Sequence, residues 1–289
     1  MKQAILIQCH NNPELIEELI DFFPKDCFDF YIHIDKKSNM TIHARQNVHL
    51  VENRVDVRWG RFSQVEATYA LIDSISKPSQ YSYCHLISGT DFPVKDVNGF
   101  VNYFSNNTAE YIESNYLDGT STWSWGGKDR FQVYYPQWMI QRPQSNKWKR
   151  IIRVLYREFV MRTKIFKRRD QPVERFYGGS SWWSLTGDCV EWIKYNTKPD
   201  YYNFFRHGVC VDEIYFSTLV RYSPFSENIV GKHKRYMIWD DPNNASGGPA
   251  VITDARIEGA ISSEDFFARK VVDLKVARQI EMLLMHGSK

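Results

Sequence analysis

Two adjacent carboxylates, Asp212 and Glu213, begin a segment whose apolar residues recur with helical spacing. A carboxylate at the start of a helix faces unpaired backbone N–H groups and the positive end of the helix dipole, so it ionises easily. An ionised carboxylate on a rigid element can serve as a general base. Taken alone, the pair is better explained by plain helix capping by Asp212, with Glu213 as an ordinary first-turn acid. The pair is therefore a candidate site that needs support from the rest of the chain.

Three polar segments fall where predicted strands end or a helix begins. They are His33–Ser38 after a strand at 28–34, Ser88–Val94 after a strand at 81–87, and Trp59–Glu66. Polar groups at the carboxyl edge of a parallel sheet converge on one crevice. Asp35 could contact the base or ribose of a nucleotide there, and Asp91 a sugar hydroxyl. Turn chemistry also explains each segment alone, because Asp, Ser, Gly and Pro are favoured turn residues.

Strands and helices alternate through the first third of the chain, which predicts a parallel sheet with crossover helices. Strands are expected at 4–9, 28–34, 49–51, 55–57, 81–87 and 181–185, and helices after Pro13, from Ser63 with a capping box to Glu66, at 188–195 and at 212–222. The first strand is not followed by GxGxxG, so a dinucleotide-binding fold is not indicated. The 289 residues contain no repeat and no clear linker, which predicts a single α/β domain.

Composition narrows the classes of function. A net charge of +3 does not favour general nucleic-acid binding. The aromatic content of 15% fits a cleft that stacks on sugars or bases, or an aromatic-rich core. Five scattered cysteines without a CxxC favour reduced, mostly buried thiols in a cytoplasmic protein. The first apolar run is too short for a signal peptide, and no run reaches transmembrane length.

Positive charge is concentrated in residues 147–169, which carry ten basic residues against one acid, Glu158. Apolar residues recur between the bases at roughly helical spacing. A basic amphipathic helix of this kind is typical of peripheral contact with an anionic membrane. The alternative is a solvated helix face that packs on the domain.

Six segments, taken in order, resemble the core-2/I-branching β-1,6-N-acetylglucosaminyltransferases, which are related to peptide O-xylosyltransferases. They are HIDKKS, WGRFSQVEA, YCHLISGTDFPVK, GGSSWWSLTGDCVEWI, VDEIYFSTLV and FFARKV, and the resemblance as a whole spans about residues 4–273. The resemblance implies a GT-A-type glycosyltransferase fold, with a mostly parallel Rossmann-like sheet flanked by helices. Its nucleotide-binding half would be residues 1–115 and its acceptor-binding and catalytic half residues 116–289.

The resemblance also implies the reaction and the residues on the donor side. The donor would be a UDP-sugar, most readily UDP-N-acetylglucosamine. The transfer would invert the configuration at the anomeric carbon and would need no metal ion or other cofactor. Lys270 matches a lysine on the donor diphosphate. The family's arginine on the diphosphate falls near Thr253, and Arg256 or Arg269 could replace it. The uridine-contacting aspartate corresponds to Asp35, and His33 and Asp91 are the neighbouring candidates on the donor side.

On the acceptor side, Glu213 takes the position of the family's catalytic base, with Asp212 as the fallback. Glu113 resembles a contact to the acceptor sugar, and Trp182 a residue that lines the acceptor cleft. Arg130 is a further acceptor-side candidate, together with Lys128. The alternative for Trp182 is a core aromatic, and for Lys270 and Arg269 solvated helix charges.

The vertebrate members of this family have a membrane anchor and several disulfides, which are missing from this sequence. We therefore expect a compact, bacterial-type enzyme of the cytoplasm, held at the inner membrane face by residues 147–169 and acting on a glycan that could be lipid-linked. Three alternatives stay open. They are a xylosyltransferase of the same family, a metal-dependent hydrolase with His10, His33, Asp35 and Asp91 as ligands, and a non-catalytic glycan- or membrane-binding protein.

Overall fold

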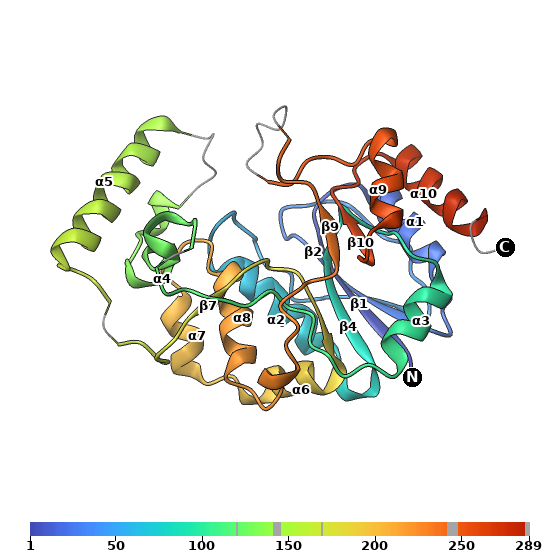
Figure 1. Cartoon of the computed structure of the whole chain (residues 1–289), viewed down its shortest axis with the longest axis horizontal. Coiled ribbons are helices and arrows are strands. Elements are labelled where there is room, and N and C mark those ends of the chain that lie inside the picture. The colour runs from blue at the N-terminus through green and yellow to red at the C-terminus, as the bar shows by residue number, and fades with distance from the viewer. Residues whose placement is uncertain (120, 141–145, 169, 242–247, 287–289) are drawn as a thin grey trace.

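The centre of the molecule is a five-stranded sheet in the order β3-β2-β1-β4-β8 (Figure 1). The computed structural model describes all residues except 120, 141–145, 169, 242–247 and 287–289. The strands are β1 (Gln3–Cys9), β2 (Phe28–Ile34), β3 (Val48–Leu50), β4 (Tyr83–Ser88) and β8 (Trp183–Thr186). The first four are parallel, and β8 runs antiparallel to β4. The predicted α/β fold with a mostly parallel sheet is confirmed.

Helices cover both faces of this sheet. They are α1 (Pro13–Phe22), α2 (Ser63–Ser74), α3 (Val97–Ser105), α6 (Gly187–Asn196), α7 (Pro199–Phe205), α8 (Asp212–Arg221), α9 (Ile257–Ser262) and α10 (Leu274–His286). Successive residues of a strand point to opposite faces. Ala4 and Leu6 of β1 join a core with α2, α6, α7 and α8, whereas Ile5 and Ile7 join one with α1, α3, α9 and α10. A strand covered on both faces explains the uninterrupted burial of β1.

Two small sheets extend the carboxyl edge of the central one. Their strands are β5 (Asp91–Pro93), β9 (Arg235–Met237) and β10 (Phe267–Arg269) in one, and β6 (Asn115–Tyr116) and β7 (Tyr177–Gly178) in the other. β5 begins three residues after β4 ends and pairs antiparallel with β10. This pairing puts Arg269 directly opposite Asp91. The remaining helices are α4 (Asp129–Gln132) and α5 (Lys147–Thr163), with five 3-10 turns between Pro78 and Arg256.

Two local predictions are wrong. Residues 55–57 form no strand, because the N–H of Val55 donates to His33 Nε2 at 2.8 Å instead of to a neighbouring strand. The capping box at Ser63 does not form either. Ser63 is the first residue of the helix and the N-cap is Phe62, whose backbone is already helical; the Ser63 hydroxyl accepts a hydrogen bond from the N–H of Arg58.

Other predicted elements are confirmed with shifted ends. The strand expected at 181–185 begins at Trp183, because the Ser181 hydroxyl is bonded to Asp212. The basic helix ends at Thr163, where Lys164 takes the left-handed conformation. All five cysteines are free, three of them buried. The boundary between nucleotide-binding and acceptor-binding halves stays a prediction, since β8 of the second half completes the sheet of the first.

Arg235 fastens the three-stranded sheet to the central one. Its fully buried guanidinium donates to the carbonyls of Leu86 at 2.9 Å and Trp183 at 2.6 Å, and to Ser184 Oγ at 2.8 Å. Burial lowers the pKa of Arg235 to about 9, although the charges of Asp91 and Asp265 oppose this. The side chain therefore stays protonated at neutral pH and bridges β9, β4 and β8.

We predict that Arg235→Met lowers the free energy of unfolding by about 3 kcal/mol or more, because several buried acceptors lose their donor while the aliphatic stem is kept. Urea unfolding measures this. The control is Arg278→Met, which removes an ion pair between Glu18 and an exposed arginine and should change the stability far less than Arg235→Met. Equal losses in the two variants would contradict the bridging role.

Candidate active site

Glu213 lies in the first turn of α8, with 35% of its side chain exposed. Its carboxylate accepts a hydrogen bond from the guanidinium of Arg130. Arg130 is itself held in place, because its guanidinium stacks on the Trp123 ring, 3.6 Å from the ring centroid. A stacked cation with a fixed donor orients the carboxylate, and the exposed remainder of Glu213 is free to meet a substrate hydroxyl.

Asp212 lies beside Glu213 but in a different environment. Its Oδ2 accepts a hydrogen bond from Ser181 Oγ at 2.7 Å. The N-cap of α8 is Val211, so the capping explanation for Asp212 is wrong. Burial, together with the charge of Glu213, raises the pKa of Asp212 to about 6, against the opposing effects of Ser181 and Arg130. One carboxylate thus faces an arginine and the other a hydroxyl.

The backbone of residues 178–182, the glycine segment, joins several of the predicted acceptor-side residues. The N–H of Gly179 donates to the carbonyl of Glu213 at 2.9 Å. The next N–H, that of Ser180, donates to the carboxylate of Glu113 at 2.8 Å. Glu113 and Glu213, which lie one hundred residues apart in the sequence, are therefore held on the same short stretch of backbone.

Trp182, at the end of the glycine segment, contacts a residue that was predicted on the donor side. The guanidinium of Arg269 lies over its ring, 4.6 Å from the centroid. Arg269 also pairs with Asp91 at 2.8 Å, and Asp91 accepts the N–H of Ser88 at the end of β4. The side chain of Asp91 has no exposed surface. In this arrangement, Asp91 holds the guanidinium of Arg269 in place. Trp182, Arg269 and Asp91 thus form one chain of contacts.

Lys270 and Arg256 approach a different stretch of backbone from Arg269. A Cβ on Gly248 would lie 2.9 Å from Lys270 Nζ, so the ammonium rests against that glycine. Arg256 donates to the carbonyl of Val251 at 2.9 Å. Lys270 and Arg256 therefore flank residues 248–252, whereas Arg269 faces β4. Arg256 also pairs with Asp241 at 2.6 Å, so each of the two arginines is bound to a carboxylate. Thr253 directly precedes the 3-10 turn that carries Arg256.

Asp35 and His33 lie at the end of β2. The carboxylate of Asp35 accepts two hydrogen bonds from Lys37 Nζ, at 2.8 and 3.0 Å. Burial lowers the pKa of His33, which keeps the ring neutral so that it can accept from Val55. Because β1 lies between β2 and β4, Asp35 and Asp91 stand about two strand spacings, or about 10 Å, apart on the carboxyl edge.

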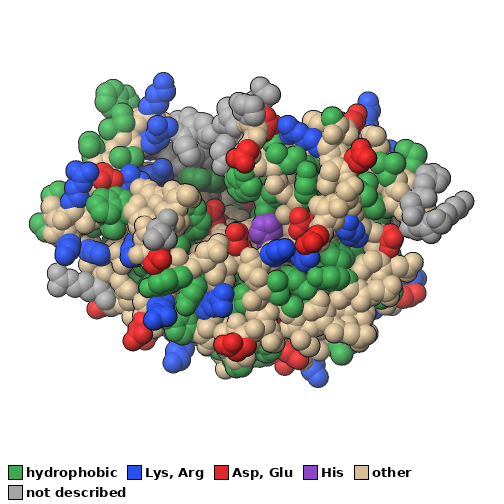
Figure 2. All heavy atoms as spheres, in the orientation of Figure 1, with side chains coloured by type: hydrophobic (Ala, Val, Ile, Leu, Met, Phe, Trp, Pro, Cys, Tyr) green, Lys and Arg blue, Asp and Glu red, His purple; other side chains and the backbone are tan. Residues whose placement is uncertain are grey.

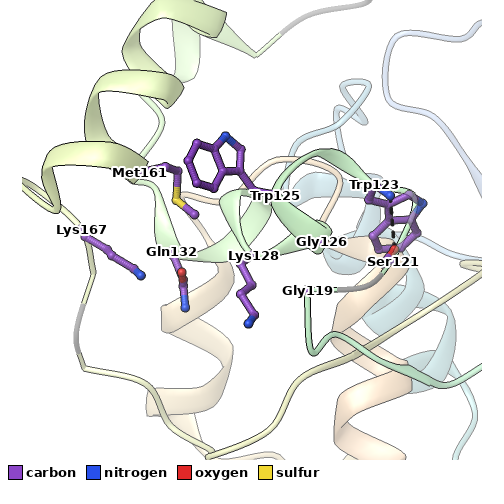
Figure 3. A pocket seen from close by; sticks show the side chains of 9 residues that line it. All are labelled: Gly119, Ser121, Trp123, Trp125, Gly126, Lys128, Gln132, Met161 and Lys167. Atoms are coloured by element: carbon purple, nitrogen blue, oxygen red, sulfur yellow. Dashed lines mark hydrogen bonds between the residues drawn. The ribbon is translucent and has the colours of Figure 1, made fainter.

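A cavity of ≈ 520 Å³ lies beside the acceptor-side residues (Figure 3). Trp123 lines it and also supports Arg130, so this tryptophan links the cavity to the arginine that holds the candidate base. It is lined by Gly119, Ser121, Trp123, Trp125, Gly126, Lys128, Gln132, Met161 and Lys167. Apart from Lys128, these residues were not identified from the sequence. The aromatic excess indicated such a lining, but nothing in the sequence showed which tryptophans would form it.

The proposed metal-binding alternative lacks geometric support. Within the described ranges, no three His, Cys, Asp or Glu side chains are grouped so that they could hold a metal ion. His33 is committed to Val55 and Asp91 to Arg269. These side chains therefore do not converge on a common ligand position with His10 and Asp35.

A family model described as Core-2/I-Branching enzyme matches residues 5–260. The chain belongs to this family. Its members are glycosyltransferases, and the α/β architecture described above is consistent with their GT-A-type fold. Xylosyltransferase 2 of Canis lupus familiaris and that of Bos taurus are each 24% identical to the chain over 225 residues. The match covers 73% of this chain but 23% of each relative, so the similarity concerns a minor part of those longer proteins.

We predict that Asp212→Asn removes a pH-dependent penalty on folding. A carboxyl group whose pKa is raised binds its proton more tightly in the folded state, so its contribution to stability falls as pH rises from about 4 to about 6. Above that range the variant should be more stable than the wild type by at most about 3 kcal/mol.

Urea unfolding of both proteins across this pH range measures the difference. Asp200→Asn is the matched control, since Asp200 is an exposed acid in the first turn of α7. A stability difference between wild type and Asp212→Asn that does not change with pH would contradict the raised pKa.

Proposed function

We propose that the protein transfers a sugar from a UDP-sugar to a hydroxyl group of a glycan, with inversion and without a metal ion. One observation carries the proposal. The glycine segment (178–182) contacts the candidate base Glu213 through Gly179 and contacts Arg269, the neighbour of Lys270, through Trp182. The general base and one donor-side arginine therefore border the same few residues, and Lys270 directly follows that arginine in the chain, which supports a direct displacement between acceptor and donor.

In the proposed reaction, the carboxylate of Glu213 takes the proton of the acceptor hydroxyl. The hydroxyl oxygen then forms a bond to the anomeric carbon from the face opposite the diphosphate. The bond from that carbon to the diphosphate oxygen breaks, its electron pair stays on UDP, and the configuration is inverted. Arg130 keeps the Glu213 carboxylate oriented during this step, while Glu113 and Trp182 contact the acceptor.

Charge develops on the departing diphosphate, and a transferase without a metal ion needs fixed cations there. Lys270 and Arg256 are the candidates, because both flank residues 248–252. Asp35 would contact the uridine at the end of β2, with His33 shaping the adjoining loop through Val55. The crevice at the carboxyl ends of β2, β1 and β4 is where open α/β sheets bind their ligands.

The transferred sugar is N-acetylglucosamine in the leading proposal, as the core-2/I-branching resemblance implies. Xylose is the second candidate, since part of xylosyltransferase 2 of Canis lupus familiaris is similar in sequence to this chain. Turnover of UDP-N-acetylglucosamine against UDP-xylose with a panel of glycans decides between them. A few contacts to single hydroxyl or methylene groups set this choice.

We predict that Glu213→Gln lowers kcat by about 100-fold or more, because the amide cannot accept the proton of the acceptor hydroxyl. UDP affinity should change little, since Glu213 lies on the acceptor side. Asp212→Asn is the matched comparison and should lose about tenfold or less, because it keeps the acceptor of the Ser181 hydrogen bond. A larger loss in Asp212→Asn than in Glu213→Gln would make Asp212 the base.

We predict that Lys270→Ala weakens UDP much more than uridine, because uridine carries no phosphate. Calorimetry with both ligands, in chelator and again with Mg²⁺, measures the effect. Arg256→Ala should behave in the same way, and Lys275→Ala, at an exposed position of α10, should bind both ligands normally. Equal losses for UDP and uridine would mean that Lys270 acts through structure. A loss of wild-type UDP affinity of about tenfold on chelation would contradict the metal-free reaction.

A further inference from the structure

Helix α5 directs its apolar stripe toward solvent. Trp148, Ile151, Ile152, Leu155 and Phe159 share one side of the helix, because they recur at i, i+3, i+4, i+7 and i+11. Their exposed fractions run from 43% to 74%. Figure 2 shows hydrophobic side chains interspersed with basic ones over this helix, at the upper left of the molecule. A surface helix normally turns such a stripe toward the core, so this orientation needs a reason.

The other side of α5 attaches the helix to the protein. Val160 and Met161 are buried in a small core with Val133 and Tyr135. Arg157, on the same inward side, forms an ion pair with Asp129 at 3.6 Å. The apolar stripe is therefore not available to the core in this arrangement, because the helix is anchored through the opposite side.

The exposed apolar surface continues past the end of the helix and carries a positive rim. Ile165 and Phe166, in the turn after α5, are exposed by 50% and 71%. The exposed bases near the stripe are Lys147, Arg162 and Lys164. The single acid of the helix, Glu158, is already bonded to Trp125, Arg157 and Arg162.

We propose that α5 and the turn after it, residues 147–166, dock on the surface of an anionic lipid bilayer. The apolar stripe would lie at the boundary between headgroups and acyl chains, and the basic rim would meet lipid phosphates. A second copy of the chain fits this surface less well, because two such faces would bring two positive rims together. Among the described residues, no helix is long and apolar enough to cross a membrane, so the contact is a surface one.

Docking in this orientation has a consequence for the site. Met161 of α5 and Lys167 line the cavity (Figure 3), so the cavity would lie on the protein side of α5, about one helix diameter, or about 10 Å, from the bilayer. A glycan attached to a membrane lipid would reach that cavity without leaving the membrane. The docking inference itself does not rest on the proposed transfer reaction, and it is tested without any sugar donor.

Vesicle flotation of the full chain tests the proposal, with phosphatidylcholine vesicles and with vesicles that also contain phosphatidylglycerol. The wild type should float with the anionic vesicles at least about tenfold more strongly, and added salt should weaken this binding. Replacement of Trp148, Leu155 and Phe159 by Ser should reduce it by about tenfold or more, because the apolar anchor is lost. The control replaces Met282, Leu283 and Met285 by Ser, at positions of α10 that are also exposed, and should bind like the wild type.

Circular dichroism and a thermal shift with UDP establish that each variant is folded. Equal flotation with the two kinds of vesicle at low salt, or equal loss in the α5 and α10 variants, would overturn the proposal. So would a concentration-dependent dimer, seen by analytical ultracentrifugation, that the α5 variant abolishes while vesicle binding is absent. Transferase activity on a soluble acceptor should be unaffected by the α5 substitutions, which separates a failure of docking from a failure of the proposed reaction.

Discussion

The active-site arrangement depends on the close approach of backbone to side chains at Gly178 and Gly179. A Cβ on Gly179 would lie 2.6 Å from the Cβ of Glu113, and one on Gly178 would lie 2.8 Å from the Trp123 ring. No side chain fits at either position without displacing these neighbours. Because both residues are glycine, Glu113, Trp123 and Glu213 can all lie against one strip of backbone. Any larger residue there would separate the candidate base from the residues that orient it.

The direction of β8 explains why this strip lies at the ligand crevice. In a parallel sheet, ligands bind beyond the carboxyl ends of the strands. β8 runs antiparallel to β4, so its beginning, not its end, lies at that edge. The glycine segment, which directly precedes β8, is thereby delivered beside Ser88 and Asp91. Arg235 holds β4 and β8 together at the same place through its hydrogen bonds to the carbonyls of Leu86 and Trp183.

Sequence patterns predicted the elements whose signals are local. Strand 28–34 has the predicted bounds, and the periodic helices at α1, α2, α6 and α8 are present, because apolar spacing records which side of an element is buried. The capping box at Ser63 failed because the preceding residues already turn tightly enough to put Phe62 in helical geometry. The direction of β8 and the three-stranded sheet could not be predicted, since both depend on pairing between residues far apart in the chain.

The site was predictable in its residue types more than in its pairings. Glu213 and Glu113 both contact the glycine segment, which contains Trp182, while the roles of these three residues stay predictions. Arg130 holds Glu213, and Trp123 in turn holds Arg130. These contacts depend on packing between residues far apart in the chain, so the spacing of residues in the sequence could not predict them. Likewise, periodicity identified α5 as amphipathic but could not show which of its sides faces the protein, because that depends on the core around Val160.

The central claim is that Glu213 and Lys270 act on opposite sides of one anomeric carbon. A crystal structure of the protein with an intact, non-transferable UDP-sugar analogue, grown in excess chelator, tests it most directly. The account predicts that Lys270 Nζ contacts the diphosphate without an intervening metal ion. It also predicts that the Glu213 carboxylate lies on the face of the anomeric carbon opposite the diphosphate. A diphosphate bound away from Lys270, or an anomeric carbon that faces away from Glu213, would contradict it.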